Sequence, residues 1–522
     1  MYTHSNQLRE AKGFSEINKN TMVGRKIYLM SVATLLILIG IISLVSYNQT
    51  QSYNLHLNTL QISYDSLQMQ YNDLQGNFSN IGDQYDTLLS NYNELLRAPG
   101  LTYDITDYGA IPDDQIDDAR AFVKILSAHP SNMQIRIPSG TFLINTSIDL
   151  RNNDNVTILG EGSRSIIKLT TQDNIIRVES KNIVIKDLAL DGNSRYSRVA
   201  NDGITTGFHA NNLLLQNVYI HNTTGHAIQV LASKNAIINN CRFENIGFEG
   251  VNSHISGGAI CLNSVDGARI TNNQINGFFG DGGIFTSGGG VMGFTKNVLI
   301  DNNTITGGHT DEGSGIHIWQ GTNLIITNNI IHDSKLLYNS DSIHQGINGI
   351  SIFYGDNIVL YRNEVYRVSG VGLEIHGINI HVVDNYVHKF IENGSYACGF
   401  WLSAANALLE NNTIEDFTNF GILIGNDDVT NDGQLHMYPS NNEQIINNII
   451  RDTKIMEHKD SSGIRIILEG GDKKYLTIRD NKLINNMYGI WKSGSGQLID
   501  PILMGNTITG SIVEYVGITP TN

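Results

Sequence analysis

Hydrophobic and polar residues alternate along most of the chain from about Asn239 onward, and paired polar residues punctuate the alternation. One clear unit reads Gly315-Ile316-His317-Ile318, followed by the aliphatic run 324–326 and the pair Asn328-Asn329. The second residue of each pair is an asparagine that recurs at Asn240, Asn273, Asn303, Asn329, Asn363, Asn385, Asn412, Asn448, Asn481 and Asn506. The steps run from 22 residues (363 to 385) to 36 residues (412 to 448). A period in this range is typical of a repeat fold.

The alternation indicates strands with one buried and one wet face. The units differ in length but keep their strands, which is expected if insertions leave as loops from the corners of a coil. Stacked coils place equivalent residues about 4.8 Å apart. The repeated asparagines would then form a column whose amides hydrogen-bond each other and the turn backbone. The pattern predicts an all-β, single-stranded parallel β-helix over residues 103–522.

A run without charged residues, 27–47, is long enough to span a bilayer as a helix. The preceding residues 1–26 contain five cationic side chains, and no Lys or Arg follows the run until Arg97. The positive-inside rule predicts a cytoplasmic tail at 1–26 and a single-pass anchor in the cell membrane, with the β-helix outside. A removed signal peptide is the alternative, but the leading segment is long and no small-x-small site follows the run.

Residues 48–98 follow a heptad pattern. One seven-residue series consists of Leu57, Tyr64, Tyr71, Phe78, Tyr85 and Tyr92. A second series, offset by three, consists of Leu60, Leu67, Leu74, Ile81, Leu88 and Leu95. This a/d pattern predicts a coiled-coil stalk that makes the protein a homo-oligomer, and the aromatic a positions favour a trimer. A helix that packs on its own domain is the alternative. Pro99-Gly100 ends the pattern.

The opening of the β-helix region contains Asp107-Tyr108-Gly109-Ala110, a cluster of aspartates at 113–118 and the segment 137–142, Ile-Pro-Ser-Gly-Thr-Phe. These features resemble the pectate lyase superfamily of right-handed parallel β-helices, which includes polysaccharide lyases, polygalacturonase-like hydrolases, epimerases and phage tailspikes. The resemblance is strong over 103–165 and loose beyond. It implies a right-handed coil and a helix after Asp118 that caps its open end. We interpret the aspartates as turn and helix N-terminal residues rather than metal ligands.

The family's catalytic signatures are absent as sets. Gly225-His226 and Gly308-His309 lack the glycine that would complete Gly-His-Gly, no Arg-x-Lys accompanies them, and no Asp-Pro-His-Glu occurs. The resemblance therefore implies the fold but names no reaction.

The alternation predicts which side chains leave the coil. In each Gly-Ile-x-Ile strand the isoleucines face the core, so x and the residue after the second isoleucine face solvent. The first outward column is Gln229, Cys261, Phe285, His317, Ser351, Glu374, Trp401, Leu423, Arg465 and Trp491; the second includes Trp319, Phe353 and His376. A polysaccharide site needs aromatic rings that stack on sugar faces and titratable side chains that transfer protons. We predict Glu374, His317 and His376 as catalytic residues, and Trp319, Phe353, Trp401, Asn348 and Tyr354 as substrate-binding residues.

Two chemistries fit these residues. A lyase would use His317, His376 or Tyr354 as base, with Asn348 or a cation such as Ca²⁺, held by an acidic loop, neutralising a uronate carboxylate. An inverting glycoside hydrolase needs two carboxylates about 6.5–9.5 Å apart, and Glu374 with Asp311, Glu312 or Asp341 are the candidates. A non-catalytic adhesin or envelope protein that binds glycans is the alternative from another class.

The amino-acid composition argues against one class of binding partner. The 522 residues carry a net charge of −16 and only 16% charged side chains, without a basic stripe, which argues against nucleic acid. The three cysteines, Cys241, Cys261 and Cys398, show no metal spacing, and we predict no metal site built by the protein's own motifs.

Overall fold

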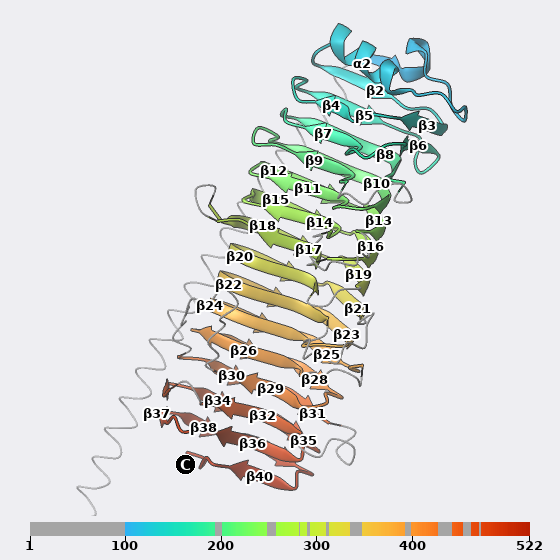
Figure 1. Cartoon of the computed structure of the whole chain (residues 1–522). Helices are drawn as coiled ribbons and strands as arrows, with labels where there is room; N and C mark the ends of the chain where they lie inside the picture. Colours follow the sequence, from blue (N-terminus) through green and yellow to red (C-terminus); the bar gives the residue numbers. More distant parts are fainter. Residues whose placement is uncertain are drawn as a thin grey trace, which may run out of the picture. The chain divides into compact units, whose positions relative to one another are not determined.

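The computed structural model describes residues 100–193, 201–247, 257–280, 282–289, 293–308, 313–334, 347–391, 398–425, 441–452, 461–468 and 471–521. The predicted cytoplasmic tail, membrane helix and coiled-coil stalk (1–26, 27–47 and 48–98) lie outside these residues. Within the described part, no helix is long and apolar enough to cross a membrane. The described chain is almost entirely β, and its strands form a parallel β-helix, as predicted (Figure 1).

Each coil contributes to three rows of parallel strands. Row 1 contains β4 (Ile148–Leu150), β7 (Ile176–Val178), β9 (Ile204–Thr206), β11 (Ile228–Leu231), β14 (Ile260–Asn263), β17 (Gly282–Ser287), β26 (Phe400–Ala405), β29 (Phe420–Ile424), β32 (Ser462–Ile467), β36 (Tyr488–Ser493) and β40 (Val513–Val516). Row 2 contains β1 (Leu101–Asp104), β2 (Met133–Arg136), β5 (Val156–Leu159), β12 (Lys234–Asn239), β15 (Asp266–Thr271), β18 (Thr295–Asp301), β27 (Leu408–Glu410), β30 (Gln444–Ile446), β34 (Thr477–Arg479) and β38 (Ile502–Met504).

Row 3 contains β3 (Gly140–Ile144), β6 (Ser165–Leu169), β13 (Arg242–Ile246), β16 (Gln274–Phe278), β19 (Thr304–Gly308), β21 (Ile330–Ser334), β23 (Glu364–Val368), β25 (Tyr386–His388), β28 (Thr413–Glu415), β31 (Ile449–Arg451), β35 (Lys482–Ile484) and β39 (Thr507–Thr509). Longer strands bend from one row into the next. β8 (Ile183–Asp191) and β10 (Leu213–Thr223) join rows 2 and 3, whereas β20 (Ser314–Thr327), β22 (Asn348–Tyr361) and β24 (Leu373–Val383) join rows 1 and 2. A small separate pair is formed by β33 (Lys473–Lys474) and β37 (Leu498–Ile499).

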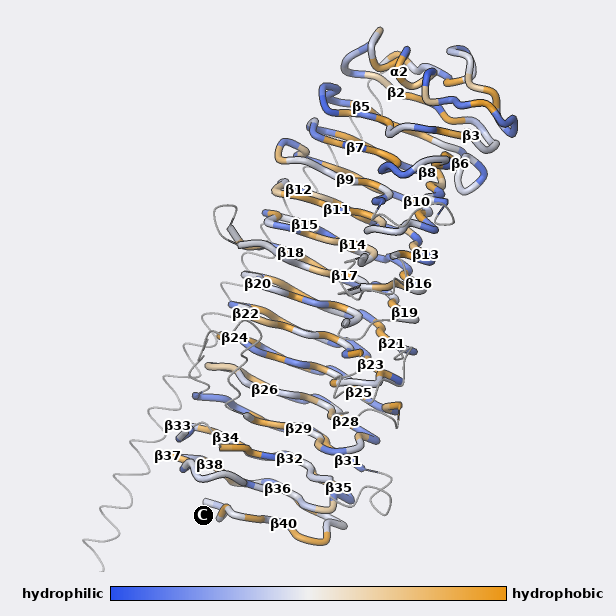
Figure 2. The backbone as a smooth tube through the Cα atoms, in the orientation of Figure 1, coloured by the Kyte–Doolittle hydropathy of each residue, from blue (hydrophilic) through white to orange (hydrophobic). Residues whose placement is uncertain are grey.

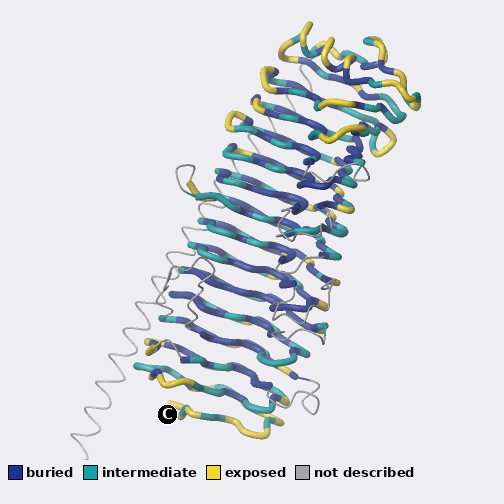
Figure 3. Tube along the Cα trace, viewed as in Figure 1, coloured by how far each residue is buried: buried dark blue, intermediate teal, exposed yellow. Residues whose placement is uncertain are grey.

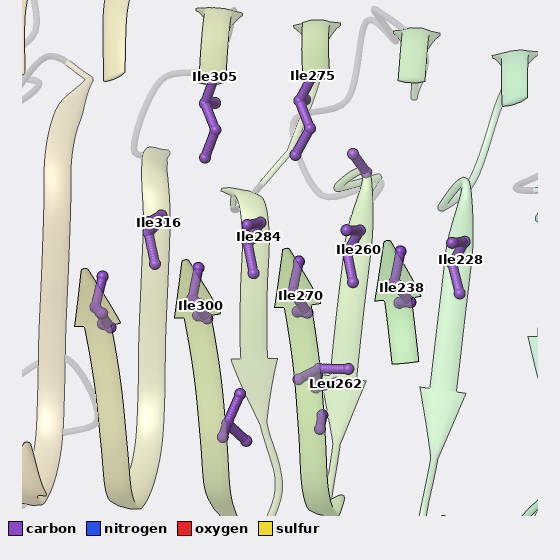
Figure 4. Packing of buried hydrophobic residues seen from close by; sticks show 14 of the residues in the cluster. Ile228, Ile238, Ile260, Leu262, Ile270, Ile275, Ile284, Ile300, Ile305 and Ile316 are labelled. Atoms are coloured by element: carbon purple, nitrogen blue, oxygen red, sulfur yellow. The ribbon is translucent and has the colours of Figure 1, made fainter. Parts of the chain in front are cut away.

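The core consists of columns of aliphatic side chains inside the coil. Ile228, Ile260, Ile284 and Ile316 are consecutive register partners in row 1, and all four are fully buried (Figure 4). Hydrophobic and hydrophilic residues alternate along the strands, which places one set inside and the other outside (Figure 2). Apolar burial at roughly 25 cal/mol per Å² is the main stabilising contribution to such a stack.

Buried asparagines form a continuous ladder at the turn between rows 2 and 3. The side-chain Nδ2 of each donates to Oδ1 of the next at 2.9–3.0 Å, from Asn273 through Asn506. Each also donates to a backbone carbonyl of a row 2 strand in the preceding coil, as Asn363 does to Ile326 O of β20 at 2.9 Å. The predicted column is confirmed over these coils.

The first predicted member of the column is wrong by one residue. Cys241 is buried at the ladder position, and its backbone N–H donates to Asn273 Oδ1 at 2.9 Å. Asn240 lies one position outward in a left-handed conformation (φ 52°), where its Nδ2 donates to Asn217 Oδ1 at 2.6 Å. The Cys241 side chain, similar in size to asparagine, fills the buried ladder position without breaking the repeat. The sequence pattern did not indicate that this position is 241 and not 240.

A helix, α2 (Ala119–Ala128), covers the N-terminal end of the stack, preceded by the short 3₁₀ helix η1 (Ile105–Tyr108) (Figure 1). Phe122 and Ile125 of α2 are buried. The nearby aspartates accept backbone hydrogen bonds: Asp113 from Thr141, and Asp118 from Ile111 and Leu143. The predicted turn and helix N-terminal roles are confirmed for Asp114 and Asp117, which accept from the backbone N–H groups of Ile116 and Ala119. Asp118 lies at the N-cap of α2 without a side-chain capping bond, so its role is to link separate segments.

Candidate functional site

Outward side chains of row 1 form the predicted columns. Phe285 aligns with His317, His317 with Ser351, Ser351 with Glu374, and Glu374 with Trp401. In the second column Trp319 aligns with Phe353 and His376 with Ser403. Parallel, in-register stacking alone brings these residues together, because it places equivalent side chains in successive coils next to each other.

The rings of these columns form one continuous cluster, which we name the row 1 cluster: Phe285, His317, Trp319, Phe353, Tyr354, His376 and Trp401. His317 lies 5.5 Å from Phe285 and 5.6 Å from Phe353, measured between ring centroids. Trp319 lies 5.7 Å from Phe353 and 5.1 Å from Tyr354. Phe353 stacks on His376 at 4.9 Å and 7°, and His376 meets Trp401 at 5.8 Å and 60°.

Glu374 and His376 do not face open solvent, contrary to the prediction for their columns. Each is only 3% exposed. Phe353 covers one face of the His376 ring, and Asn348 contacts the Glu374 carboxylate. The alternation correctly predicts that these side chains leave the core, but it carries no information about the neighbours that cover them.

The Glu374 carboxylate is held by three groups. Oε2 accepts hydrogen bonds from Asn348 Nδ2 at 2.7 Å and from Ser351 Oγ at 3.1 Å. Oε1 lies 3.3 Å from His376 Nε2. A carboxylate in this position orients the imidazole and favours the tautomer that carries its proton on Nε2. The nitrogen left as a base is then His376 Nδ1.

Two buried polar atoms at this point have no hydrogen-bond partner among the described residues: His376 Nδ1 and Trp401 Nε1. Their rings are in contact. Buried polar atoms without partners are costly and uncommon in folded proteins, so these two nitrogens are candidate contacts for a polar ligand group.

Asn348 is buried, and both polar atoms of its side chain are hydrogen-bonded, because Oδ1 also accepts from the backbone N–H of Val371 at 2.7 Å.

Tyr354 lies at the corner between rows 1 and 2 in a left-handed conformation (φ 57°). Most left-handed positions in this chain hold Asn or Asp. The register between β22 and β24 shifts at this corner, so two residues of β22, Phe353 and Tyr354, oppose His376. Bulges of this kind re-aim side chains.

The structure thus brings all eight predicted site residues into one neighbourhood, and their roles stay predictions. His317 lies two coils from Glu374, so it is not a partner of that carboxylate. Sequence reasoning missed Ser351 and Ser314 as members of the carboxylate network, in which Ser314 Oγ donates to Ser351 Oγ at 2.8 Å. It also missed Cys398, whose pKa is raised by burial and by the charge of Glu374.

The acidic loop residues Asp311, Glu312 and Asp341 lie outside the described residues. In the described part of the chain, no group of three or more His, Cys, Asp or Glu side chains could hold a metal ion.

Comparison with known proteins identifies the fold family. A family model of rhamnogalacturonase A/epimerase, pectate lyase-like proteins matches residues 102–336, and a model of the right-handed β-helix region matches residues 339–511. The chain belongs to the right-handed parallel β-helix superfamily. No curated protein matches this β-helix protein in sequence.

Solved structures of several right-handed β-helices are similar. The mannuronan C-5 epimerase AlgE6 A-module of Azotobacter vinelandii is 18% identical, with a TM-score of 0.50 over 79% of this chain and 99% of that one. The surface adhesin PfbA of Streptococcus pneumoniae is 14% identical, with a TM-score of 0.43 over 81% and 92%. An exopolygalacturonase of Thermotoga maritima is 14% identical, with a TM-score of 0.40 over 73% and 93%. At these identities the likeness concerns the fold alone.

Proposed function

We propose that this β-helix protein binds a polysaccharide along row 1 and cleaves it as a lyase, with His376 as the base and Glu374 as its positioning partner. The observation that supports this most is the Glu374–His376 contact of 3.3 Å, together with two buried nitrogens, His376 Nδ1 and Trp401 Nε1, that have no hydrogen-bond partner among the described residues.

The aromatic residues support binding. Trp319 and Trp401 are only partly buried, and each meets one neighbouring ring edge-on, at 77° for Tyr354 and at 60° for His376. Trp319 also stacks on His317 at 6.2 Å and 29°. Phe353 differs, because its face is stacked on His376. We therefore assign sugar contact to the two tryptophans and assign Phe353 to holding the imidazole in place.

The reaction follows from the imidazole tautomer. Neutral His376 donates Nε2–H to Glu374 and takes a proton at Nδ1 from the sugar carbon next to a uronate carboxylate. The electron pair of that C–H bond forms a carbon–carbon double bond, the bond to the glycosidic oxygen breaks, and the leaving oxygen takes a proton from solvent. Glu374 stabilises the imidazolium, and Trp401 Nε1–H can donate to the substrate carboxylate.

A hydrolase is the second candidate and is less well supported. An inverting hydrolase needs a carboxylate that is free to activate water, whereas both oxygens of Glu374 have contacts at 2.7–3.3 Å. Its proposed carboxylate partners lie in undescribed loops. A glycan-binding adhesin without turnover remains the other alternative.

We also propose that residues 27–47 anchor the protein in the cell membrane and that residues 48–98 form a trimeric coiled-coil stalk outside it. The support is the uncharged run, the excess of cations before it and the sustained heptads. A stalk of this length would carry the β-helix roughly 65–75 Å from the bilayer, at about 1.5 Å per residue.

The decisive experiment screens the full chain against a glycan array and then incubates it with each glycan that binds. A lyase releases fragments with unsaturated ends, seen by their ultraviolet absorbance. New reducing ends without unsaturation would indicate the hydrolase, and tight binding without either product would indicate the adhesin. Failure to bind any glycan would overturn the proposal.

A further inference from the structure

A groove lies beside the capping helix, far along the chain from the row 1 cluster. Phe122, Val123 and Leu126 of α2 form one wall, and Ile148 and Asn153 lie on the other side. Its volume is about 410 Å³. The helix wall is apolar, and Val123 is 57% exposed although it lines the groove.

The end of a solenoid is the place where such exposure is least expected, because terminal caps normally present a polar outer face. The cap nevertheless exposes Leu101, Ile111 and Ile116 by 54–69% in addition to Val123. Figure 3 shows many exposed residues, in yellow, at this N-terminal end of the stack. This end of the β-helix therefore presents apolar side chains that a further segment would bury.

The chain enters the β-helix next to this groove. β1 begins at Leu101, which pairs with Met133 of β2, and a Cβ on Gly100 would lie 3.0 Å from the carbonyl oxygen of Asn132. Pro130, two residues before Asn132, lines the groove. Its carbonyl accepts a hydrogen bond from the Asn153 side chain at 3.0 Å, which ties this edge of the groove to its floor.

The segment just before Gly100 carries a suitable side chain. Leu95 is the last residue of the second heptad series, and Leu96 follows it in neither series, so a coiled-coil core does not need Leu96. Leu96 lies four positions before Gly100. At about 3.3–3.6 Å per residue, the chain from Leu96 to Gly100 spans at most ~14 Å. By the same rule Pro130 lies at most ~7 Å from Asn132, so Leu96 is within reach of the groove.

We propose that Leu96 of the same chain occupies the groove between α2 and β4 and thereby fixes the junction between the stalk and the β-helix. This inference does not depend on the proposed enzymatic function. A docked junction would hold the row 1 cluster at a set orientation to the stalk instead of letting the β-helix swivel on Pro99-Gly100.

Limited proteolysis tests the proposal on the full chain. Arg97 is the only trypsin site between Lys26 and Arg120. If Leu96 is docked, Arg97 is protected, and the fragment that begins at Ala98 forms slowly. Val123→Asp places a charge in the groove and should speed this cleavage at least tenfold. Ile116→Asp, at an exposed cap position outside the groove, should leave the rate unchanged.

A second variant, Ser127→Trp, fills the groove without adding charge and should have the same effect as Val123→Asp, so a failure of one variant to fold leaves the test intact. Melting temperatures of all variants identify any unfolded protein. Cleavage at Arg97 that is equally fast in the wild type and both groove variants would overturn the proposal. Protection that disappears on dilution would also overturn it, because a second copy would then be the occupant.

Discussion

Row 1 and row 3 of the β-helix both carry stacked rings, and they differ in what those rings contact. On row 3, His332, Tyr366 and His388 are register partners in successive coils and stack at 4.7 Å and 5.2 Å. The same geometric rule produces the row 1 cluster. Stacked aromatics alone are therefore a consequence of coil spacing and do not identify a site.

Two ring groups of row 3 contact glutamates. Tyr386 OH donates to Glu415 Oε2 at 3.0 Å, and Glu415 is paired with Arg451. His388 stacks on Tyr386 at 4.0 Å, with Nε2 at 2.9 Å from Glu364. Burial and the hydrogen bond to Glu415 raise the pKa of Tyr386 to about 12.

This arrangement occurs twice. Tyr219 and His221 stack at 4.4 Å, Tyr219 OH donates to Glu244 at 2.7 Å, and Arg242 donates to the same carboxylate. In both copies an arginine neutralises the carboxylate. Glu374 of row 1 is instead bound by an amide, a hydroxyl and an imidazole. The carboxylates that accept from the two tyrosines are therefore paired with arginines, whereas Glu374 contacts neutral groups and an imidazole. His388 with Glu364 is the row 3 pair that most resembles His376 with Glu374.

The largest expected difference is in turnover. His388 also has a buried Nδ1 without a hydrogen-bond partner among the described residues, so it is the matched control. His376→Ala should reduce the release of unsaturated ends by about 10²–10⁴-fold, as loss of a general base does, while His388→Ala should change it less than twofold. An equal loss of turnover in both variants would contradict the assignment of His376 as the base.

The asparagine ladder supports both surfaces and should affect them alike. Asn363→Ala leaves Asn329 N–H and the Ile326 carbonyl, both buried, without their side-chain partner. At about 1–3 kcal/mol per unsatisfied group, the free energy of unfolding should fall by roughly 3–5 kcal/mol. Asn328→Gly, at an exposed left-handed position, should cost less than about 1 kcal/mol. Urea unfolding measures both; similar costs would show that the buried ladder is dispensable.

The third expected difference between row 1 and row 3 is in glycan affinity. Trp401→Ala should weaken binding roughly five- to a hundredfold, which corresponds to about 1–3 kcal/mol, with little change in melting temperature. Tyr366→Ala on row 3 should leave affinity unchanged. Calorimetric titration with the bound glycan provides the measurement, and a loss of affinity from Tyr366→Ala would place a ligand on row 3 as well.

The smallest effect concerns acid stability on row 3. A side-chain hydrogen bond from Arg367 lowers the pKa of Asp333 to about 2. The folded pKa lies below the usual value, so this pair stabilises the fold above about pH 4 and loses its effect as the pH falls through 2. The pair is exposed, so its contribution should stay below about 1 kcal/mol. Asp333→Asn should therefore lower the melting temperature slightly at pH 5 and not at pH 2. An equal effect at both values would contradict the assignment.

The sequence alone predicted the β-helix, the register of the outward columns and the set of eight residues that meet on row 1. It could do so because a parallel stack repeats one local rule: alternation decides inside or outside, and equivalent positions in successive coils become neighbours. The same rule predicted the buried asparagine column, although the paired residues Asn239-Asn240 hid the one-residue shift to Cys241.

The burial, hydrogen-bond partners and orientation of the site side chains follow from contacts between coils and were not predictable from the local sequence. Glu374 and Glu415 are both outward glutamates on β-strands, and no local pattern reveals that one faces Asn348 and an imidazole while the other faces an arginine. Those partners come from other coils, 26 residues away for Asn348 and 36 for Arg451. The groove beside α2 likewise arises between a helix and a strand that are separate in sequence. Contacts across coils of variable length depend on loop lengths and corner bulges, and these are set by the packing of the whole stack.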